Sequence, residues 1–220
     1  MKSTNKTSLL KSDHIQIVKN IFWDFDGVIK DSVAIKADAF EQLFLPFGKQ
    51  LAKKVRLHHE EHGGMSRFDK FPLYLSWSSQ EKSESLVNEY AKKFSTLVKQ
   101  QVIDSRWVDG VLEYLQNNHE NQQFFLVTAT PQQEIEEIIS ELKIQYYFQQ
   151  VIGSPTSKNR ALKILLEKYT IDPEDSIMIG DSSSDYEAAL ANQVEFILRK
   201  TVLNKKLQEQ LNCQMIEDFR

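Results

Sequence analysis

The chain has a single cysteine, Cys213, in 220 residues, so it cannot form an intramolecular disulfide. It lacks any apolar run near the roughly 18 residues that a membrane-spanning helix needs. It also lacks a basic surplus, because the net charge is −4 at pH 7 and the lysines and arginines are scattered among acids. Proteins that bind nucleic acid or anionic membranes normally carry a basic patch. We therefore expect neither kind of partner.

The N-terminal residues 1–16, MKSTNKTSLLKSDHIQ, are polar and contain no apolar signal core. We therefore expect a cytoplasmic protein. We also expect a monomer or a weak homodimer. Hydrophobic residues make up 41% of the chain and aromatic residues 10%, which is enough for a buried core and argues against global disorder. The length allows one large domain, or a core domain with a smaller insert.

Four short apolar segments are typical of buried strands, because each is too short for a helix and is bounded by a turn or a polar cluster. They are residues 21–23, 124–127, 177–179 and 196–198, with 151–152 as a weaker fifth. Helical patterns lie between them, at residues 109–118, 131–142, 159–169 and 184–191. Strands that alternate with helices predict an α/β fold with a doubly wound parallel sheet.

Residues 33–104 interrupt this alternation. They contain no convincing strand, and apolar residues recur at helical spacing in three segments, residues 34–45, 50–62 and 81–102. Gly63-Gly64 and Pro72 are expected to separate these helices. The sequence therefore predicts an all-helical insert at residues 33–104, within a core made of residues 1–32 and 105–220.

Polar side chains follow the predicted strands. Asp24 and Asp26 follow the first strand, and Gly27 comes next. Like charges this close are costly unless a cation, a shared proton or solvent relieves them. Ligands of open parallel sheets bind outside the carboxyl ends of the strands. Four segments far apart in sequence are therefore expected to meet at this edge, and their polar or turn residues are Asp24, Asp26, Gly27, Thr128, Thr130, Lys158, Gly180, Asp181 and Asp185.

These four segments, in this order, resemble the four motifs of the haloacid dehalogenase-like (HAD) hydrolase superfamily. They are DFDGV at 24–28, LVTAT at 126–130, GSPTSKNRAL with Lys158, and GDSSSD at 180–185. The first motif has the form found in the phosphatases and phosphomutases of the superfamily. WVDGVLEYL at 107–115 also resembles the segment that re-enters the core after a helical cap. The resemblance, to a phosphoglycolate phosphatase and β-phosphoglucomutase-like subgroup, implies that the insert is a cap domain.

The resemblance implies a role for each acid of the site. Asp24 is the expected nucleophile, which attacks phosphorus and forms an aspartyl-phosphate. Asp26 is the expected acid and base, which protonates the leaving oxygen and then activates water. The expected cofactor is Mg²⁺, held by the Asp24 carboxylate, the backbone carbonyl of Asp26, and Asp181. Asp185 is expected to support the metal, or to act mainly as an acid at a helix N-terminus.

The same resemblance places substrate contacts on both parts of the chain. Thr128 and Lys158 are expected to hold phosphate oxygens, and Lys158 also offsets the crowded carboxylates. Gly27 allows a tight turn beside the ligand. Arg67, in the turn HGGMSRF, and Lys36 are the candidate contacts from the cap. The expected activity is Mg²⁺-dependent hydrolysis of a small phosphorylated metabolite, such as a sugar phosphate or a phosphoglycolate-like ester.

Two other functions stay open at this stage. A β-phosphoglucomutase-like enzyme shares both aspartates and a helical cap, but typically carries a histidine near the position of Lys36. A non-catalytic phospho-acceptor, similar to a receiver domain, would lack both the helical insert and the late GDSSSD motif. Asp26 argues against a dehalogenase, which needs no acid for a halide leaving group.

Several side chains have a plain structural interpretation beside the functional one. Arg67 is as well explained by a solvated loop, and Thr130 is expected to cap the following helix. His58, His59 and His62 are better explained by a partly exposed helix than by a metal site. The aromatic residues of the insert are expected to form its core rather than a sugar platform; they are Phe68, Phe71, Tyr74 and Trp77.

Overall fold

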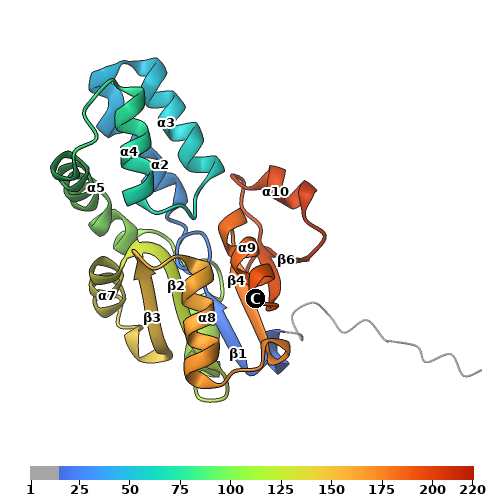
Figure 1. Cartoon of the computed structure of the whole chain (residues 1–220). Coiled ribbons are helices and arrows are strands. Elements are labelled where there is room, and N and C mark those ends of the chain that lie inside the picture. The colour runs from blue at the N-terminus through green and yellow to red at the C-terminus, as the bar shows by residue number, and fades with distance from the viewer. Residues whose placement is uncertain (1–14) are drawn as a thin grey trace, which may run out of the picture.

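The computed structural model describes residues 15–220, and Figure 1 shows their arrangement. The polar N-terminal segment, on which the expected lack of a signal sequence rests, lies almost entirely outside these residues. Within residues 15–220, no helix combines the length and apolar character needed to cross a membrane.

Six parallel strands form one sheet in the order β3-β2-β1-β4-β5-β6. The chain therefore builds the sheet from β1 outward in one direction and then returns to place β4 on the other side of β1. This confirms the predicted doubly wound sheet and puts its topological switch point between β1 and β4. The strands are β1 (Asn20–Trp23), β2 (Gln123–Pro131), β3 (Phe148–Ser154), β4 (Ser176–Gly180), β5 (Glu195–Arg199) and β6 (Gln214–Ile216).

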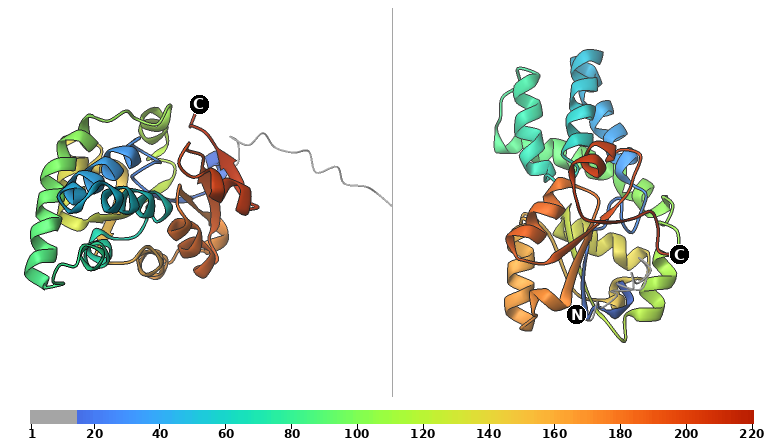
Figure 2. Two further views of the ribbon diagram at one scale, coloured as in Figure 1. Left: turned by 90° about the horizontal axis from the view of Figure 1, so that it is seen from above. Right: turned by 90° about the vertical axis from the view of Figure 1, so that its right-hand side faces the viewer.

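Helices cover both faces of the sheet (Figure 2), which is why its strands read as continuous apolar runs. Alternate residues of β1 face opposite sides: Trp23 joins the buried cluster that includes α6 and α7, whereas Phe22 packs in the cluster that includes α8 and α9. The helices are α6 (Val111–Asn118), α7 (Gln132–Glu141), α8 (Lys158–Tyr169), α9 (Ser183–Ala191) and α10 (Lys205–Gln210). Short 3₁₀ turns lie at η2 (Gln145–Tyr147) and η3 (Pro173–Asp175).

Four helices form a separate layer beyond the carboxyl ends of the strands (Figure 1), and we call them the cap. They are α2 (Val33–Phe44), α3 (Lys49–Glu61), α4 (Arg67–Trp77) and α5 (Glu84–Asp104), with the 3₁₀ turn η1 (Leu45–Phe47) after α2. Their core is aromatic, as expected: Phe71 and Tyr74 are fully buried, and the rings of Phe40 and Phe94 lie 4.2 Å apart. Phe68, by contrast, is exposed.

Helix α4 corrects the sequence analysis, which expected a break at Pro72. The helix starts after Ser66, whose hydroxyl accepts a hydrogen bond from the backbone N–H of Phe68 at 3.3 Å, and it continues through Pro72. Proline removes one backbone donor from a helix interior. Burial of Phe71 and Tyr74 offsets that loss, because both side chains pack in the aromatic core.

Candidate active site

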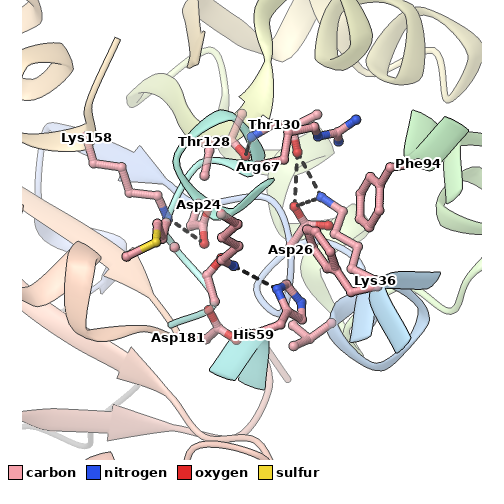
Figure 3. A pocket seen from close by; sticks show the side chains of 17 residues that line it. Asp24, Asp26, Lys36, His59, Arg67, Phe94, Thr128, Thr130, Lys158 and Asp181 are labelled. Atoms are coloured by element: carbon pink, nitrogen blue, oxygen red, sulfur yellow. Dashed lines mark hydrogen bonds and ion pairs between the residues drawn. The ribbon is translucent and has the colours of Figure 1, made fainter. Parts of the chain in front are cut away.

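The first two acids of the site lie at the topological switch point. Asp24 directly follows β1 and Asp181 directly follows β4, and the backbone N–H of Asp24 donates to the carbonyl of Ile179 at 2.9 Å. Neighbouring parallel strands end side by side, so both carboxylates enter the same crevice (Figure 3). Both side chains are buried.

Lys158 joins two of the carboxylates. It is the first residue of α8, and its Nζ lies 2.9 Å from Oδ2 of Asp24 and 2.5 Å from Oδ1 of Asp185. Burial lowers the pKa of Lys158, but the charges of Asp185 and Asp24 outweigh that effect and hold the pKa above its ordinary value. The ammonium therefore stays charged, as the predicted role of Lys158 in offsetting the acids requires.

Asp185 has the position expected of an acid at a helix N-terminus, which is one of the two roles considered for it. It lies in the first turn of α9, where its Oδ2 accepts the backbone N–H of Ser182 at 3.1 Å, so it caps that helix. Its other oxygen faces Lys158, and the side chain has no exposed surface. The acid is thus held rigidly by the helix start and directed into the site.

The carboxylates of Asp24, Asp181 and Asp185 form a cluster that could hold a metal ion. One oxygen from each lies within 4.8 Å of the other two. Burial and the charge of Asp185 raise the pKa of Asp24 to about 7, and burial and the charge of Asp24 raise the pKa of Asp181 well above its usual value. A cation among these oxygens would relieve the repulsion, and three carboxylates suit a hard divalent ion.

Gly27 lets the chain pass close to this cluster. Its φ of +77° lies in the left-handed region, and a Cβ at this position would lie 2.1 Å from Oδ2 of Asp181. A side chain there would strain the backbone and displace the acid. Position 27 therefore favours glycine because of its backbone conformation and its closeness to Asp181.

Asp26 is held by donors from both the core and the cap. Lys36 of α2 and the hydroxyl of Thr130 donate to Oδ2, and the hydroxyl of Ser32 donates to Oδ1 at 2.6 Å. Burial raises the pKa of Asp26, but the charge of Lys36 and these hydrogen bonds outweigh it and lower the pKa below its usual value. Asp26 is therefore a carboxylate in this structure.

Thr130 was expected to cap the following helix, and that expectation is wrong. Strand β2 continues to Pro131, which occupies the N-cap position of α7, and no side chain caps that helix end. The hydroxyl of Thr130 instead accepts from Nζ of Lys36 at 2.9 Å and donates to Asp26 at 3.2 Å. It therefore belongs to the site. Thr128 is also buried and lines the same cavity.

The acids and the cap enclose a cavity of about 40 Å³, lined by core residues that include Asp24 and Thr128 and by cap residues that include Lys36 and Arg67. The cap lies tightly against the core beside it. A Cβ on Gly64 of the cap would lie 1.7 Å from Oγ of Ser184 at the start of α9. The glycine pair between α3 and α4 thus permits close contact between cap and core, which leaves room for only a small ligand in this closed arrangement.

Arg67 does not lie on a solvated loop. It is the first residue of α4, only 5% of its surface is exposed, and it lines the cavity. Its guanidinium makes a two-pronged contact with Glu134 of α7, at 2.6 and 2.8 Å, and donates to the hydroxyl of Ser95 at 2.6 Å. The solvated-loop alternative is therefore wrong, and Arg67 ties the cap to the core.

The three histidines differ more than their sequence suggests. Nδ1 of His58 lies 2.9 Å from the hydroxyl of Tyr74, and His62 is exposed at the end of α3. His59, however, is only 3% exposed and lines the cavity, with its Nδ1 2.7 Å from Nζ of Lys70. Lys70 was not among the residues predicted from the sequence, because α4 was not predicted and the spacing of Lys70 from Arg67 on one helix face was therefore not visible.

This fold and site define an α/β enzyme with an acidic crevice at its topological switch point and a helical cap closed over it. A sequence model of the family described as haloacid dehalogenase-like hydrolase matches residues 21–199. The chain therefore belongs to the haloacid dehalogenase-like hydrolase family, as the four motifs indicated.

Similar proteins agree with this assignment. A phosphorylated carbohydrates phosphatase from Thermotoga maritima is 25% identical over 187 residues, which cover 80% of this chain and 82% of that protein. A phosphoglycolate phosphatase from Pseudomonas fluorescens is 26% identical over 184 residues, which cover 80% and 67%. The crystal structure of a β-phosphoglucomutase from Clostridium difficile covers 92% of each chain with a TM-score of 0.72 and 17% identity, which shows a shared fold.

Proposed function

We propose that the protein is a phosphatase that hydrolyses the phosphomonoester of a small metabolite, with Asp24 as nucleophile and Mg²⁺ as cofactor. The observation that carries this proposal is the position of Asp24, which is buried at the switch point, contacts Lys158 and belongs to the carboxylate cluster. The names of the two relatives, both phosphatases of small phosphorylated compounds, support the reaction class.

The side chains of the site divide the work of phosphoryl transfer. Asp24 attacks phosphorus to form an aspartyl-phosphate, while Lys158 and Thr128 hold phosphate oxygens as charge develops on them. Asp24, Asp181, Asp185 and the backbone carbonyl of Asp26 are the groups that would hold Mg²⁺, whose charge would neutralise the carboxylates and the phosphate. Lys158 stays charged throughout, because its partners hold its pKa high.

Asp26 acts as the general acid in the first step and as the general base in the second. The leaving oxygen needs a proton in the first step, and water must lose one in the second. The structure holds Asp26 as a carboxylate through Lys36, which is the form needed for the second step. An incoming phosphate dianion competes for Lys36 and adds negative charge beside Asp26, and both effects raise the pKa of Asp26 toward the acid form.

The test is release of inorganic phosphate from p-nitrophenyl phosphate and from a panel of sugar phosphates and phosphoglycolate, with and without Mg²⁺. We expect Mg²⁺-dependent release by the wild type and a loss of at least about 10³-fold in Asp24→Asn. A folded wild type that releases no phosphate from any ester contradicts the proposal. Isomerisation of a sugar phosphate without net release would instead support the mutase alternative.

A further inference from the structure

Lys70 is a buried lysine without a carboxylate partner among the described residues. Only 1% of its surface is exposed, and its ammonium contacts Nδ1 of His59 at 2.7 Å and the carbonyl of Gly63 at 3.5 Å. Among residues 15–220, no carboxylate lies within ion-pair distance of Lys70. The other two cations of the cap that line the cavity are each paired, Lys36 with Asp26 and Arg67 with Glu134. Burial and the positive charge of Lys36 lower the pKa of Lys70 well below its ordinary value, and an anion beside Lys70 would stabilise its charged form.

His59, which contacts Lys70, has a buried ring nitrogen without a hydrogen-bond partner among the described residues. Burial and the positive charge of Lys70 lower the pKa of His59 well below its usual value, so the ring is neutral. Nζ of Lys70 lies 2.7 Å from Nδ1 of His59, and where Lys70 donates in this contact the ring proton of the neutral His59 is on Nε2. Nε2 is fully buried and contacts no hydrogen-bond partner within the described part of the chain. The pair thus offers an amine without an anionic partner and a ring nitrogen without a hydrogen-bond partner.

Both side chains line the catalytic cavity, together with Asp24 and Thr128. Figure 3 shows His59 in this group, joined to its partner by a hydrogen bond and close to the acids. The cavity has a volume of about 40 Å³. A ligand that reaches both Asp24 and His59 in this arrangement must therefore be short.

We propose that Lys70 and Nε2 of His59 form a subsite for a second anionic group of the substrate, either a carboxylate or a second phosphate, a few bonds away from the phosphate that Asp24 attacks. The inference rests on the proposed phosphatase function and specifies its substrate class. A neutral hydroxyl could accept from Nε2 but would leave the charge of Lys70 unmatched. An anionic oxygen satisfies both groups at once.

A matched set of substrates tests the subsite. Phosphoglycolate and 2-hydroxyethyl phosphate share a two-carbon frame and differ in the carboxylate, and glycerol 1,3-bisphosphate is compared with glycerol 3-phosphate for the second phosphate. We expect kcat/KM to favour the doubly anionic member of at least one pair by about tenfold or more, and the preferred pair identifies the anion. Equal kcat/KM within both pairs overturns the inference.

Variants then assign the preference to the two residues. We expect Lys70→Met to lower the ratio of kcat/KM, anionic over neutral, by at least about tenfold. His59→Gln, which keeps a donor near the position of Nε2, should retain more of the ratio than His59→Asn. Lys53→Met, on an exposed part of α3, is the control and should leave the ratio unchanged. A folded Lys70→Met that loses activity equally on both members of the preferred pair also overturns the inference.

Failure of the proposed function is distinguishable from failure of the subsite. If the wild type releases no phosphate from any ester, including p-nitrophenyl phosphate, the phosphatase proposal fails. The subsite is then measured by isothermal titration of Asp24→Asn with the same substrate pairs. Tighter binding of an anionic member, lost on adding Lys70→Met, supports the subsite, and equal binding within both pairs contradicts it.

Discussion

The ammonium of Lys36, in the cap, contacts Oδ2 of Asp26, in the core. The cap therefore contacts the proposed acid–base group as well as forming part of the wall of the cavity. Lys36 lowers the pKa of Asp26, and a substrate that displaced Lys36 would raise it. Such a coupling would link substrate binding to the protonation state that the proposed first step needs.

Replacing Lys36 tests that coupling. Lys36 lowers the pKa of Asp26, so Lys36→Met should raise it. The limb of the pH–rate profile that reports Asp26 should then move to higher pH, by about one unit or more. Thr130→Val removes only one hydrogen bond and should move the limb less. A profile that stays in place in Lys36→Met while Thr130→Val moves it would contradict this assignment.

Replacing Asp181 tests the acidic cluster. Burial and Asp24 raise the pKa of Asp181, so the folded state disfavours its charge, and the neutral Asp181→Asn should stabilise the metal-free protein at pH 7 by about 1–3 kcal/mol. The same change removes a metal ligand, so the rise in Tm that Mg²⁺ causes in the wild type should be lost.

The control for this measurement is Glu187→Gln, an exposed acid on α9. It should change neither the stability of the metal-free protein nor its response to Mg²⁺. An unchanged Mg²⁺ response in Asp181→Asn would show that Asp181 does not hold the ion. A lower stability of metal-free Asp181→Asn would show that burial and the charge of Asp24 do not disfavour a charged Asp181 in the folded state.

The pH dependence of stability gives a further test of the same repulsion. The pKa of Asp24 is about 7 in the folded protein and about 3.9 in an unfolded chain. The folded state therefore binds more protons than the unfolded state between these values, and the free energy of unfolding of the metal-free protein should fall as the pH rises from about 4 to 7.

Asp24→Asn should make this part of the curve less steep, because one of the two acids with a raised pKa is gone and only Asp181 remains. Thermal or urea unfolding across this range measures the slope in both proteins. Equal slopes in the wild type and in Asp24→Asn would contradict the raised pKa of Asp24.

Variants of the ion pair between Arg67 and Glu134 can distinguish the contribution of Arg67 to stability from a contribution to substrate binding. Arg67→Met leaves the buried Glu134 unpaired and should lower the free energy of unfolding by about 3–5 kcal/mol. Adding Glu134→Leu should restore much of that loss, because no unpaired charge remains. Urea unfolding of both variants measures the difference.

Kinetics of the double variant show whether Arg67 also contacts substrate. If it does, kcat/KM for the best substrate stays low although stability has returned, while p-nitrophenyl phosphate is affected less. Recovery of both kcat/KM values together with stability would limit Arg67 to holding the cap against the core.

The sequence predicted five of the six strands, and the acids that follow them, because both are encoded locally; β6 was not predicted. Four of the strands contain a short apolar run, Asp24 and Asp181 directly follow a strand, and Lys158 starts a helix. Once the strands are placed in parallel, their carboxyl ends must meet, so the site follows from the order of the segments. The glycine at position 27 was also predictable, because the turn immediately follows the strand.

The cap was less predictable because its site residues depend on tertiary packing. The break expected at Pro72 hid α4, although buried aromatic packing sustains that helix, and with it the common face of Arg67 and Lys70. His59 looked like one of three partly exposed histidines, and its burial depends on how α3 packs against α2 and α4. Thr130 was assigned to the following helix because the continuation of β2 to Pro131 was not visible in the pattern.

The measurement that tests the central claim most directly is the detection of a phosphoryl group on Asp24. Wild-type protein is mixed with its best substrate and Mg²⁺, quenched in acid during turnover, digested and analysed by mass spectrometry. The account predicts the mass of one phosphoryl group on the peptide that contains Asp24, a larger amount in Asp26→Ala, and none in Asp24→Asn. Phosphate release by Asp24→Asn at the wild-type rate, or a phosphoryl group on another residue, would contradict it.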